Sequence, residues 1–145
     1  GTMITAQAAD TIDGTVVSGT YKRSTNGGRR RGLKSPAGGA WEKLSDGTYK
    51  YHFAEGLEAT DYWLEIDGTW YYFGHDNIMQ TGWVKDDGNW YYMDLETGAL
   101  FTGWHEISGK WYYFHEEGDG FKGTLMVNCE TPDGYTVDVN GALVE

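Results

Sequence analysis

Apolar and polar residues alternate along three similar stretches of the chain, each broken by a Gly-containing dipeptide. The stretches read W-L-E-I-D-G-T-W-Y-Y-F, W-V-K-D-D-G-N-W-Y-Y-M and W-H-E-I-S-G-K-W-Y-Y-F, at residues 63–73, 83–93 and 104–114. Short runs of aromatic and β-branched residues around such a dipeptide are typical of a β-hairpin with a two-residue loop. The sequence therefore predicts three hairpins, with loops at Asp67-Gly68, Asp87-Gly88 and Ser108-Gly109.

Alternation along the strands assigns the side chains of each hairpin to two faces. With the loop at Asp67-Gly68, Trp63 lies opposite Tyr72, and both share a face with Trp70. The same count groups Trp83, Trp90 and Tyr92, and then Trp104, Trp111 and Tyr113. The opposite face carries Tyr71, Tyr91 and Tyr112, which we expect in the core.

The three stretches are copies of one unit. Trp63, Trp83 and Trp104 are 20 and 21 residues apart, and the second Trp of each copy keeps this spacing. A looser copy lies at 41–53, where a loop at Ser45-Asp46-Gly47 puts Trp41, Tyr49 and Tyr51 on one face, and a decayed copy lies within 125–145. An isolated hairpin is marginal in water and must cover its apolar faces with the next copy. The pattern therefore predicts an all-β repeat solenoid of stacked β-hairpins over 41–145.

Composition supports this fold and excludes several functions. The 22 Gly and the 7 Trp, 11 Tyr and 5 Phe favour strands joined by tight turns. A single cysteine, Cys129, excludes an intramolecular disulfide and a Cys-rich zinc site. The net charge of −11 argues against general nucleic-acid binding, and no apolar run is long enough for a membrane span.

Charge divides the chain into two parts. Residues 1–40 hold six basic and two acidic residues, whereas 41–145 hold five basic and twenty acidic residues. The N-terminal segment, 1–40, has a candidate strand at 15–22 and could add strands to the array. Within it, Ala6-Gln7-Ala8 is similar to the end of a secretory signal. Arg29-Arg30-Arg31 could contact an anionic wall polymer or simply form an exposed loop.

One combination of motifs points to a known family. Thr81 to Tyr92 follows the pattern T-G-W-x4-G-x-W-Y-Y, and Gly98 to Trp104 then reads G-A-L-F-T-G-W. This pattern resembles the choline-binding, or cell-wall-binding, repeats of Gram-positive surface proteins. The resemblance covers about 41–145, is closest over 63–114, and leaves 1–40 unexplained.

The resemblance implies a left-handed solenoid that holds choline moieties of teichoic acids between consecutive hairpins. Each site would take two Trp from one hairpin, a Tyr from the next and a Met-like residue from the linker. Transferred to this chain, the sites would be Trp63, Trp70, Tyr92 and Met79, and then Trp83, Trp90, Tyr113 and Leu100. Less complete sites would be Trp41, Tyr49 and Tyr72 at one end, and Trp104, Trp111 and Tyr135 at the other. Leu100 in place of Met, His105 in place of Leu or Val, and Tyr49 in place of Trp depart from the pattern.

Aromatic cages suit the chemistry of choline. A quaternary ammonium has no N–H donor, so rings hold it through cation–π contacts of about 0.5–1 kcal/mol when exposed and about 2 when desolvated. Several weak sites on one polymer would supply useful affinity, and the acidic array favours a cationic group.

Two other interpretations remain open. Related hairpin repeats bind glucan-type carbohydrates, and Trp faces stack on sugar rings, although Trp-Tyr-Tyr in all three strong copies favours choline. Alternatively, the Trp faces only pack together, and the array is a spacer or adhesin segment without a small ligand.

Catalytic motifs are missing from the sequence. The four histidines (His52, His75, His105 and His115) show no metal-ligand spacing such as H-E-x-x-H, and no EF-hand loop is present. We therefore expect a secreted, non-catalytic module at the bacterial cell wall or cell surface, with no cofactor, no metal, no nucleic acid and no membrane span. Its expected partner is a choline-bearing teichoic acid or another cell-wall polymer.

Overall fold

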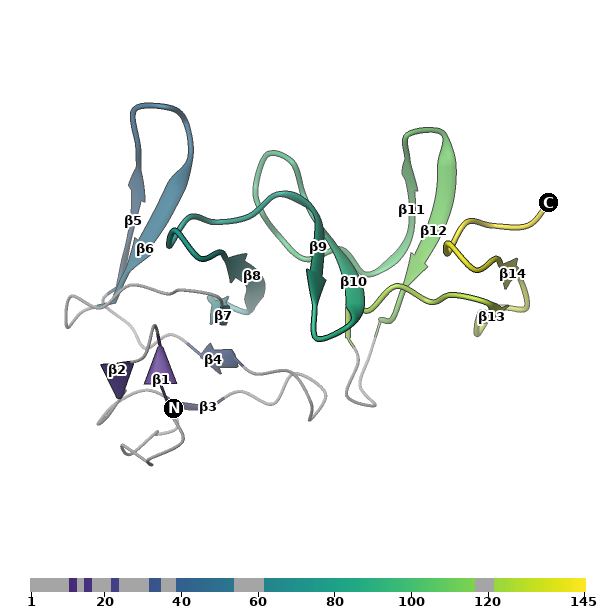
Figure 1. Cartoon of the computed structure of the whole chain (residues 1–145), viewed down its shortest axis with the longest axis horizontal. Helices are drawn as coiled ribbons and strands as arrows, with labels where there is room; N and C mark the ends of the chain where they lie inside the picture. The colour runs from purple at the N-terminus through teal and green to yellow at the C-terminus, as the bar shows by residue number, and fades with distance from the viewer. Residues whose placement is uncertain are drawn as a thin grey trace.

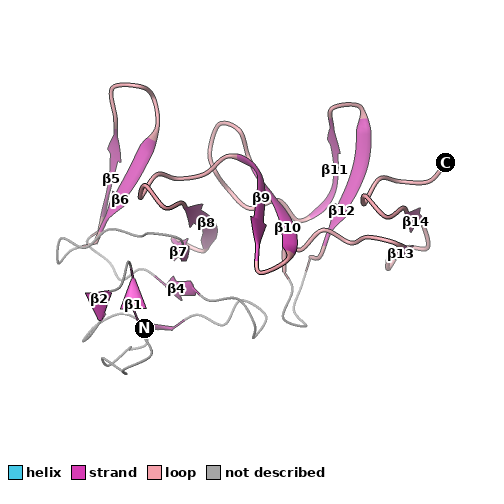
Figure 2. Ribbon diagram, viewed as in Figure 1, coloured by secondary structure: helices cyan, strands magenta, loops and turns pink. Residues whose placement is uncertain are grey.

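The computed structural model describes residues 39–53, 62–116 and 122–145, together with four short strands nearer the N-terminus. These strands are β1 (Thr11–Ile12), β2 (Thr15–Val16), β3 (Lys22–Arg23) and β4 (Gly32–Lys34). The signal-like Ala6-Gln7-Ala8 and the Arg29-Arg30-Arg31 run lie outside the described residues. The described part of the chain consists of strands, turns and loops without a helix (Figure 2). It therefore has no helix of the length and apolarity that a membrane crossing requires.

Five antiparallel hairpins follow one another along the long axis of the molecule (Figure 1). The first four are β5 (Ala40–Lys43) with β6 (Tyr49–His52), β7 (Tyr62–Ile66) with β8 (Thr69–Phe73), β9 (Gly82–Asp86) with β10 (Asn89–Met93), and β11 (Gly103–Ile107) with β12 (Lys110–Phe114). The fifth, β13 (Cys129–Glu130) with β14 (Thr136–Val137), is the decayed copy. The predicted order of hairpins is confirmed.

The predicted register is also confirmed. Trp63 pairs with Tyr72 in the second hairpin, and Trp41 pairs with Tyr51 in the first. Asp67 and Gly68 have φ angles of 51° and 82°, so both loop residues take the left-handed conformation that a type I′ turn requires. The equivalent loop residues of the third and fourth hairpins do the same.

Linkers tie each hairpin to the one before it through a repeated hydrogen bond. The backbone N–H of Met79, which follows the second hairpin, donates to the carbonyl of Tyr49 in the first at 2.8 Å. The same bond then recurs from one hairpin to the next, as Leu100 to Trp70, Leu125 to Trp90 and Leu143 to Trp111. Each linker residue also forms a β-bridge to the end of its own hairpin, such as Met79 to Phe73. The linkers thus set the spacing of the stack.

The core runs through the stack rather than through a single layer. Phe73, Met93, Phe114 and Val137 are fully buried, and each lies at the end of the second strand of its hairpin. Every one of them forms the β-bridge to its own linker. Their burial on both sides explains why the hairpins form a solenoid instead of separating.

The N-terminal segment adds strands to the second hairpin, as expected. Strand β4 pairs parallel to β7, with Gly32 opposite Trp63 and Lys34 opposite Glu65, and β3 pairs with β4. The resulting sheet has the order β3-β4-β7-β8. The second hairpin is the only described hairpin of the array that belongs to a sheet of more than two strands.

Candidate ligand-binding sites

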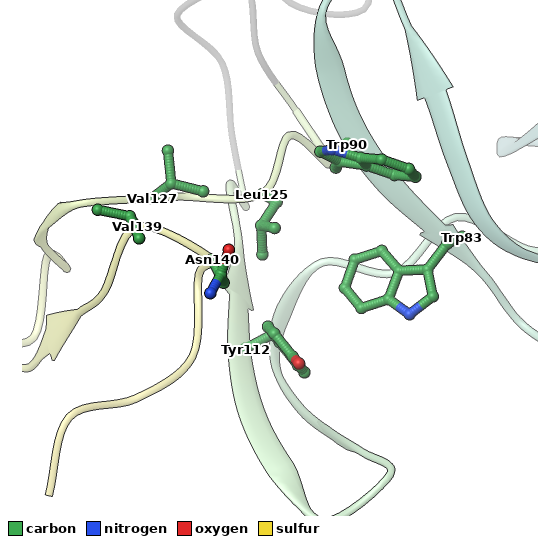
Figure 3. Close-up of a pocket in the computed structure, with 7 residues that line it drawn as sticks. All are labelled: Trp83, Trp90, Tyr112, Leu125, Val127, Val139 and Asn140. Atoms are coloured by element: carbon green, nitrogen blue, oxygen red, sulfur yellow. The ribbon is translucent and has the colours of Figure 1, made fainter.

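An open pocket lies between the third and fourth hairpins (Figure 3). Trp83 and Trp90 form one side of it, while Tyr112 and Leu125 face them from the next hairpin and its linker. The pocket encloses about 410 Å³. The indole of Trp83 meets Trp90 at 6.1 Å and 89°, and meets Tyr112 at 5.1 Å and 80°. Trp83 and Trp90 remain 39% and 42% exposed, so ring surface is free for a ligand.

The same four positions form two more pockets. Trp41, Tyr49, Tyr71 and Met79 line one of about 360 Å³ between the first and second hairpins, together with Glu96 and Thr97. Trp104, Trp111, Tyr135 and Leu143 line one of about 400 Å³ at the C-terminal end, together with Asp133. Each pocket thus combines two aromatic residues of one hairpin, one of the next unit and an aliphatic linker residue.

The equivalent residues between the second and third hairpins are packed together instead. Trp63 and Trp70 are only 1% and 4% exposed and lie in one buried cluster with Tyr91, against which Leu100 packs. The indole N–H of Trp63 donates to the carboxylate of Asp86 at 2.9 Å. In the neighbouring hairpins the position of Asp86 is taken by isoleucine, so this bond does not recur there. The second interface leaves almost no indole surface for a ligand.

The structure corrects which tyrosine faces each Trp pair. Tyr92 and Tyr113 were expected opposite Trp70 and Trp90, but Tyr92 lies beside Trp83 of its own hairpin at 5.1 Å. Tyr112 takes the expected place of Tyr113. In a stack, the Trp face of one hairpin meets the opposite face of the next, and alternation puts the first tyrosine of Trp-Tyr-Tyr on that opposite face.

The same reasoning corrects the tyrosines at the other interfaces. Tyr71 replaces Tyr72 in the first pocket, and Tyr91 contacts Trp63 at 4.8 Å in the closed interface. Tyr71 and Tyr112 therefore line pockets, although we expected them in the core.

The linker residues are displaced by one hairpin from their expected sites. Met79 was expected with Trp63 and Trp70, but it lines the pocket of Trp41. Leu100 was expected with Trp83 and Trp90, but it packs against the cluster of Trp63 and Trp70. The linker that follows a hairpin reaches back to the preceding one, as the hydrogen bonds of Met79 and Leu100 show. At the C-terminal end, Trp104, Trp111 and Tyr135 are grouped as expected.

Two of the aromatic rings that line the pockets lie close to lysine side chains of the same hairpin. The ammonium of Lys85 lies 5.7 Å from the centre of the Trp90 ring, and that of Lys43 lies 6.0 Å from the Tyr49 ring. Both distances are within the range of cation–π attraction. The rings at these two pockets therefore present faces that suit an ammonium group.

An acidic side chain shapes the C-terminal pocket. Asp133 accepts hydrogen bonds from the hydroxyl of Thr131 at 2.6 Å and from the indole N–H of Trp104 at 2.9 Å. These two bonds, the first more than the second, hold the pKa of Asp133 below its ordinary value of 3.8. The ionised carboxylate of Asp133 thereby fixes the orientation of the Trp104 indole.

This contact predicts a pH dependence at the C-terminal pocket. Because the folded state lowers the pKa of Asp133, its contribution is complete above the unfolded value and is lost as the pH falls through the lowered folded value. We expect the NMR signal of the Trp104 indole N–H to shift in that acid range. The same signal should not titrate there in Asp133→Asn, and an identical titration in both proteins would contradict the assignment.

The described residues show no candidate metal-binding site. They contain no group of three or more His, Cys, Asp and Glu side chains placed to hold a metal ion. His52 instead pairs with Glu42 at 2.6 Å, and His105 stacks on Phe101 at 3.8 Å. These two histidines therefore have structural contacts.

Comparison with known proteins identifies the repeats. A family model described as a choline-binding repeat matches residues 59–102 and 101–132, which together cover just over half of the chain. The chain belongs to the choline-binding repeat family. The closed interface lies within these matched residues, as do Trp83, Trp90, Tyr112 and Leu125 of the pocket between the third and fourth hairpins.

Several solved structures show the same fold. Choline binding protein F from Streptococcus pneumoniae, in the presence of a peptidoglycan analogue, is 34% identical over 73% of this chain and 33% of its own, with a TM-score of 0.63. The same protein in complex with ipratropium is 33% identical over 73% and 32%, with a TM-score of 0.64. The modular Cpl-1 endolysin, complexed with a peptidoglycan analogue, is 26% identical over 74% and 37%, with a TM-score of 0.53. The chain spans about a third of the length of these proteins. No curated protein matches it in sequence.

Proposed function

We propose that this chain is a non-catalytic attachment module that holds choline moieties of cell-wall teichoic acids in its three open pockets. The observation that carries the proposal is the repeated composition of these pockets. Each offers three aromatic rings and one aliphatic side chain around a cavity of about 360 to 410 Å³. Such volumes lie in the lower part of the range of small-molecule sites, roughly 300–1,000 Å³.

The pocket chemistry fits a quaternary ammonium better than a hydrogen-bonding ligand. The pocket of Trp83 and Trp90 is lined by no charged residue, and its polar groups are few. A trimethylammonium group needs no hydrogen-bond acceptor and gains attraction from every ring face around it. Ring surface therefore supplies both the contact area and the charge recognition.

Charge outside the pockets favours the same ligand. Residues 41–145 carry twenty acidic and five basic residues, which creates a negative field around the cages. Two pockets include a carboxylate side chain, Glu96 in one and Asp133 in the other. A cationic group is attracted to this surface, whereas a free anion is repelled.

Binding at one pocket is expected to be weak. Three exposed or partly desolvated cation–π contacts correspond to a dissociation constant of about a millimolar. A polymer that carries many choline groups can occupy several pockets at once and bind far more tightly. This proposal places the module at the bacterial cell surface, where such a polymer is found.

A parallel titration tests the proposed function. Tryptophan fluorescence is followed while choline is added to one sample and dextran to another. Saturation by choline with no response to dextran is the expected result. Saturation by dextran alone would reassign the pockets to sugars, and silence with both ligands would leave the repeats as a scaffold.

A further inference from the structure

The pocket of Trp83 and Trp90 extends beyond its aromatic cage. Val127, Val139 and Asn140 line it in addition to the four repeated positions. Figure 3 shows Leu125 between the two indoles and the two valines, and all five side chains line the same pocket. The other two pockets have polar residues in addition to the four repeated positions. These residues are Glu96 and Thr97 in the pocket of Trp41, and Asp133 in the pocket of Trp104.

The aliphatic wall is held in place by the C-terminal hairpin. The carboxylate of Asp138 accepts hydrogen bonds from the backbone N–H groups of Asn140 at 2.8 Å and Ala142 at 2.9 Å. The backbone N–H of Asn128 donates to the carbonyl of Asp138 at 2.7 Å, which ties the segment after Val127 to the turn that carries Val139. The two valines are therefore presented from a fixed backbone.

Both valines leave apolar surface uncovered. Val127 is 44% exposed and Val139 is 70% exposed, although each lines the pocket. Apolar surface beside a cation site gains free energy when a ligand covers it. A bare trimethylammonium group that sits among the rings would leave the valine wall in water.

We propose that the Trp83–Trp90 pocket selects quaternary ammonium ligands that carry an uncharged apolar substituent. The ammonium lies among Trp83, Trp90 and Tyr112, and the substituent lies on Val127 and Val139. The residues that line this pocket are uncharged, so its wall suits an uncharged apolar substituent, and the amide of Asn140 can bond a polar group at its edge. This inference rests on the proposed function, since it assumes that the cage holds an ammonium group.

The test compares two cations at each pocket separately. Tetramethylammonium and benzyltrimethylammonium are titrated against the ¹⁵N-labelled chain, and the indole N–H signals of Trp41, Trp83 and Trp104 report the three pockets. At Trp83 we expect the benzyl compound to bind about tenfold more tightly than tetramethylammonium, because the phenyl ring covers the valines. The ratio should be smaller at Trp41 and Trp104, which lack this wall.

Variants separate the wall from the cage. In Val127→Ser/Val139→Ser, the ratio at Trp83 should fall to about threefold or less, with the affinity for tetramethylammonium unchanged. Val144→Ser is the matched control, because Val144 is 53% exposed on the same C-terminal segment and does not line the pocket. It should leave the ratio unchanged.

Each alternative outcome is distinct. Equal ratios at the three pockets, or an unchanged ratio in the double variant, would overturn the inference and leave the proposed function intact. Binding of neither cation would overturn both. Concentration-dependent sedimentation of the parent chain that the double variant abolishes would show that a second copy covers the valines, which would also overturn the inference.

Discussion

Replacing Trp63 with alanine is expected to destabilise the array by about 3–5 kcal/mol, as for other buried Trp-to-Ala substitutions. Trp63 is 1% exposed, packs against Tyr72 and Tyr91 at 4.8 Å each, and donates its indole N–H to Asp86. Its removal leaves a cavity between the second and third hairpins. Since small domains are stable by only about 5–15 kcal/mol in total, a large share of the folded state would be lost.

Urea denaturation followed by circular dichroism measures this loss. The matched control is Trp83→Ala, at the same position of the next repeat, where the side chain is 39% exposed. We expect the control to cost less, about 1–2 kcal/mol, because a partly exposed side chain leaves a smaller cavity when it is removed. Equal unfolding midpoints for the two variants would mean that the second interface is not closed.

Replacing Trp90 with alanine is expected to abolish binding at one pocket while the fold is retained. Trp90 is 42% exposed and forms a wall of the pocket between the third and fourth hairpins. Loss of one ring of three removes a cation–π contact and opens the cage to water. Calorimetric titration with choline should report one site fewer than in the parent chain.

Trp90→Phe is the control for this change, since it keeps an aromatic face at the same position. It should retain the full number of sites with weaker binding at one of them. An unchanged number of sites in Trp90→Ala would remove this indole from the ligand site. A lost β-sheet signal in that variant would show instead that Trp90 belongs to the core.

The hairpins and their register could be predicted because they depend on local chemistry. Asp67-Gly68 favours a two-residue loop, and once the loop is fixed, alternation fixes which side chains share a face with Trp63. The period of the Trp residues then requires a stack. Nothing beyond neighbouring residues enters these steps.

The predicted partners of the Trp pairs were wrong where two hairpins meet. Alternation already places Tyr112 on the face opposite Trp111, so the partner of Trp90 could have been found from the sequence by asking which faces meet in a stack. The linker of Leu125 is harder, because its hydrogen bond to Trp90 depends on the path of the chain between hairpins. Asp86 accepts the indole N–H of Trp63 across the second interface, a contact to the preceding hairpin that no repeat pattern encodes.

The sequence pattern did not predict the pocket residues that lie outside the repeat unit. Val127 and Val139 fall in the decayed copy, where the Trp and Tyr positions that define the unit are missing. They reach the pocket only because the last hairpin folds beside Leu125. Their contribution therefore depends on three-dimensional packing.

The indole N–H signals of the 7 tryptophans offer the most direct test of the three-pocket arrangement. In a choline titration of the ¹⁵N-labelled chain, we predict saturable shifts for the tryptophans that line open pockets, namely Trp41, Trp83, Trp90, Trp104 and Trp111. The signals of Trp63 and Trp70 should stay almost unchanged, since both indoles are buried in the closed interface. Large shifts confined to Trp63 and Trp70, or no saturable shift at any indole, would contradict this arrangement of sites.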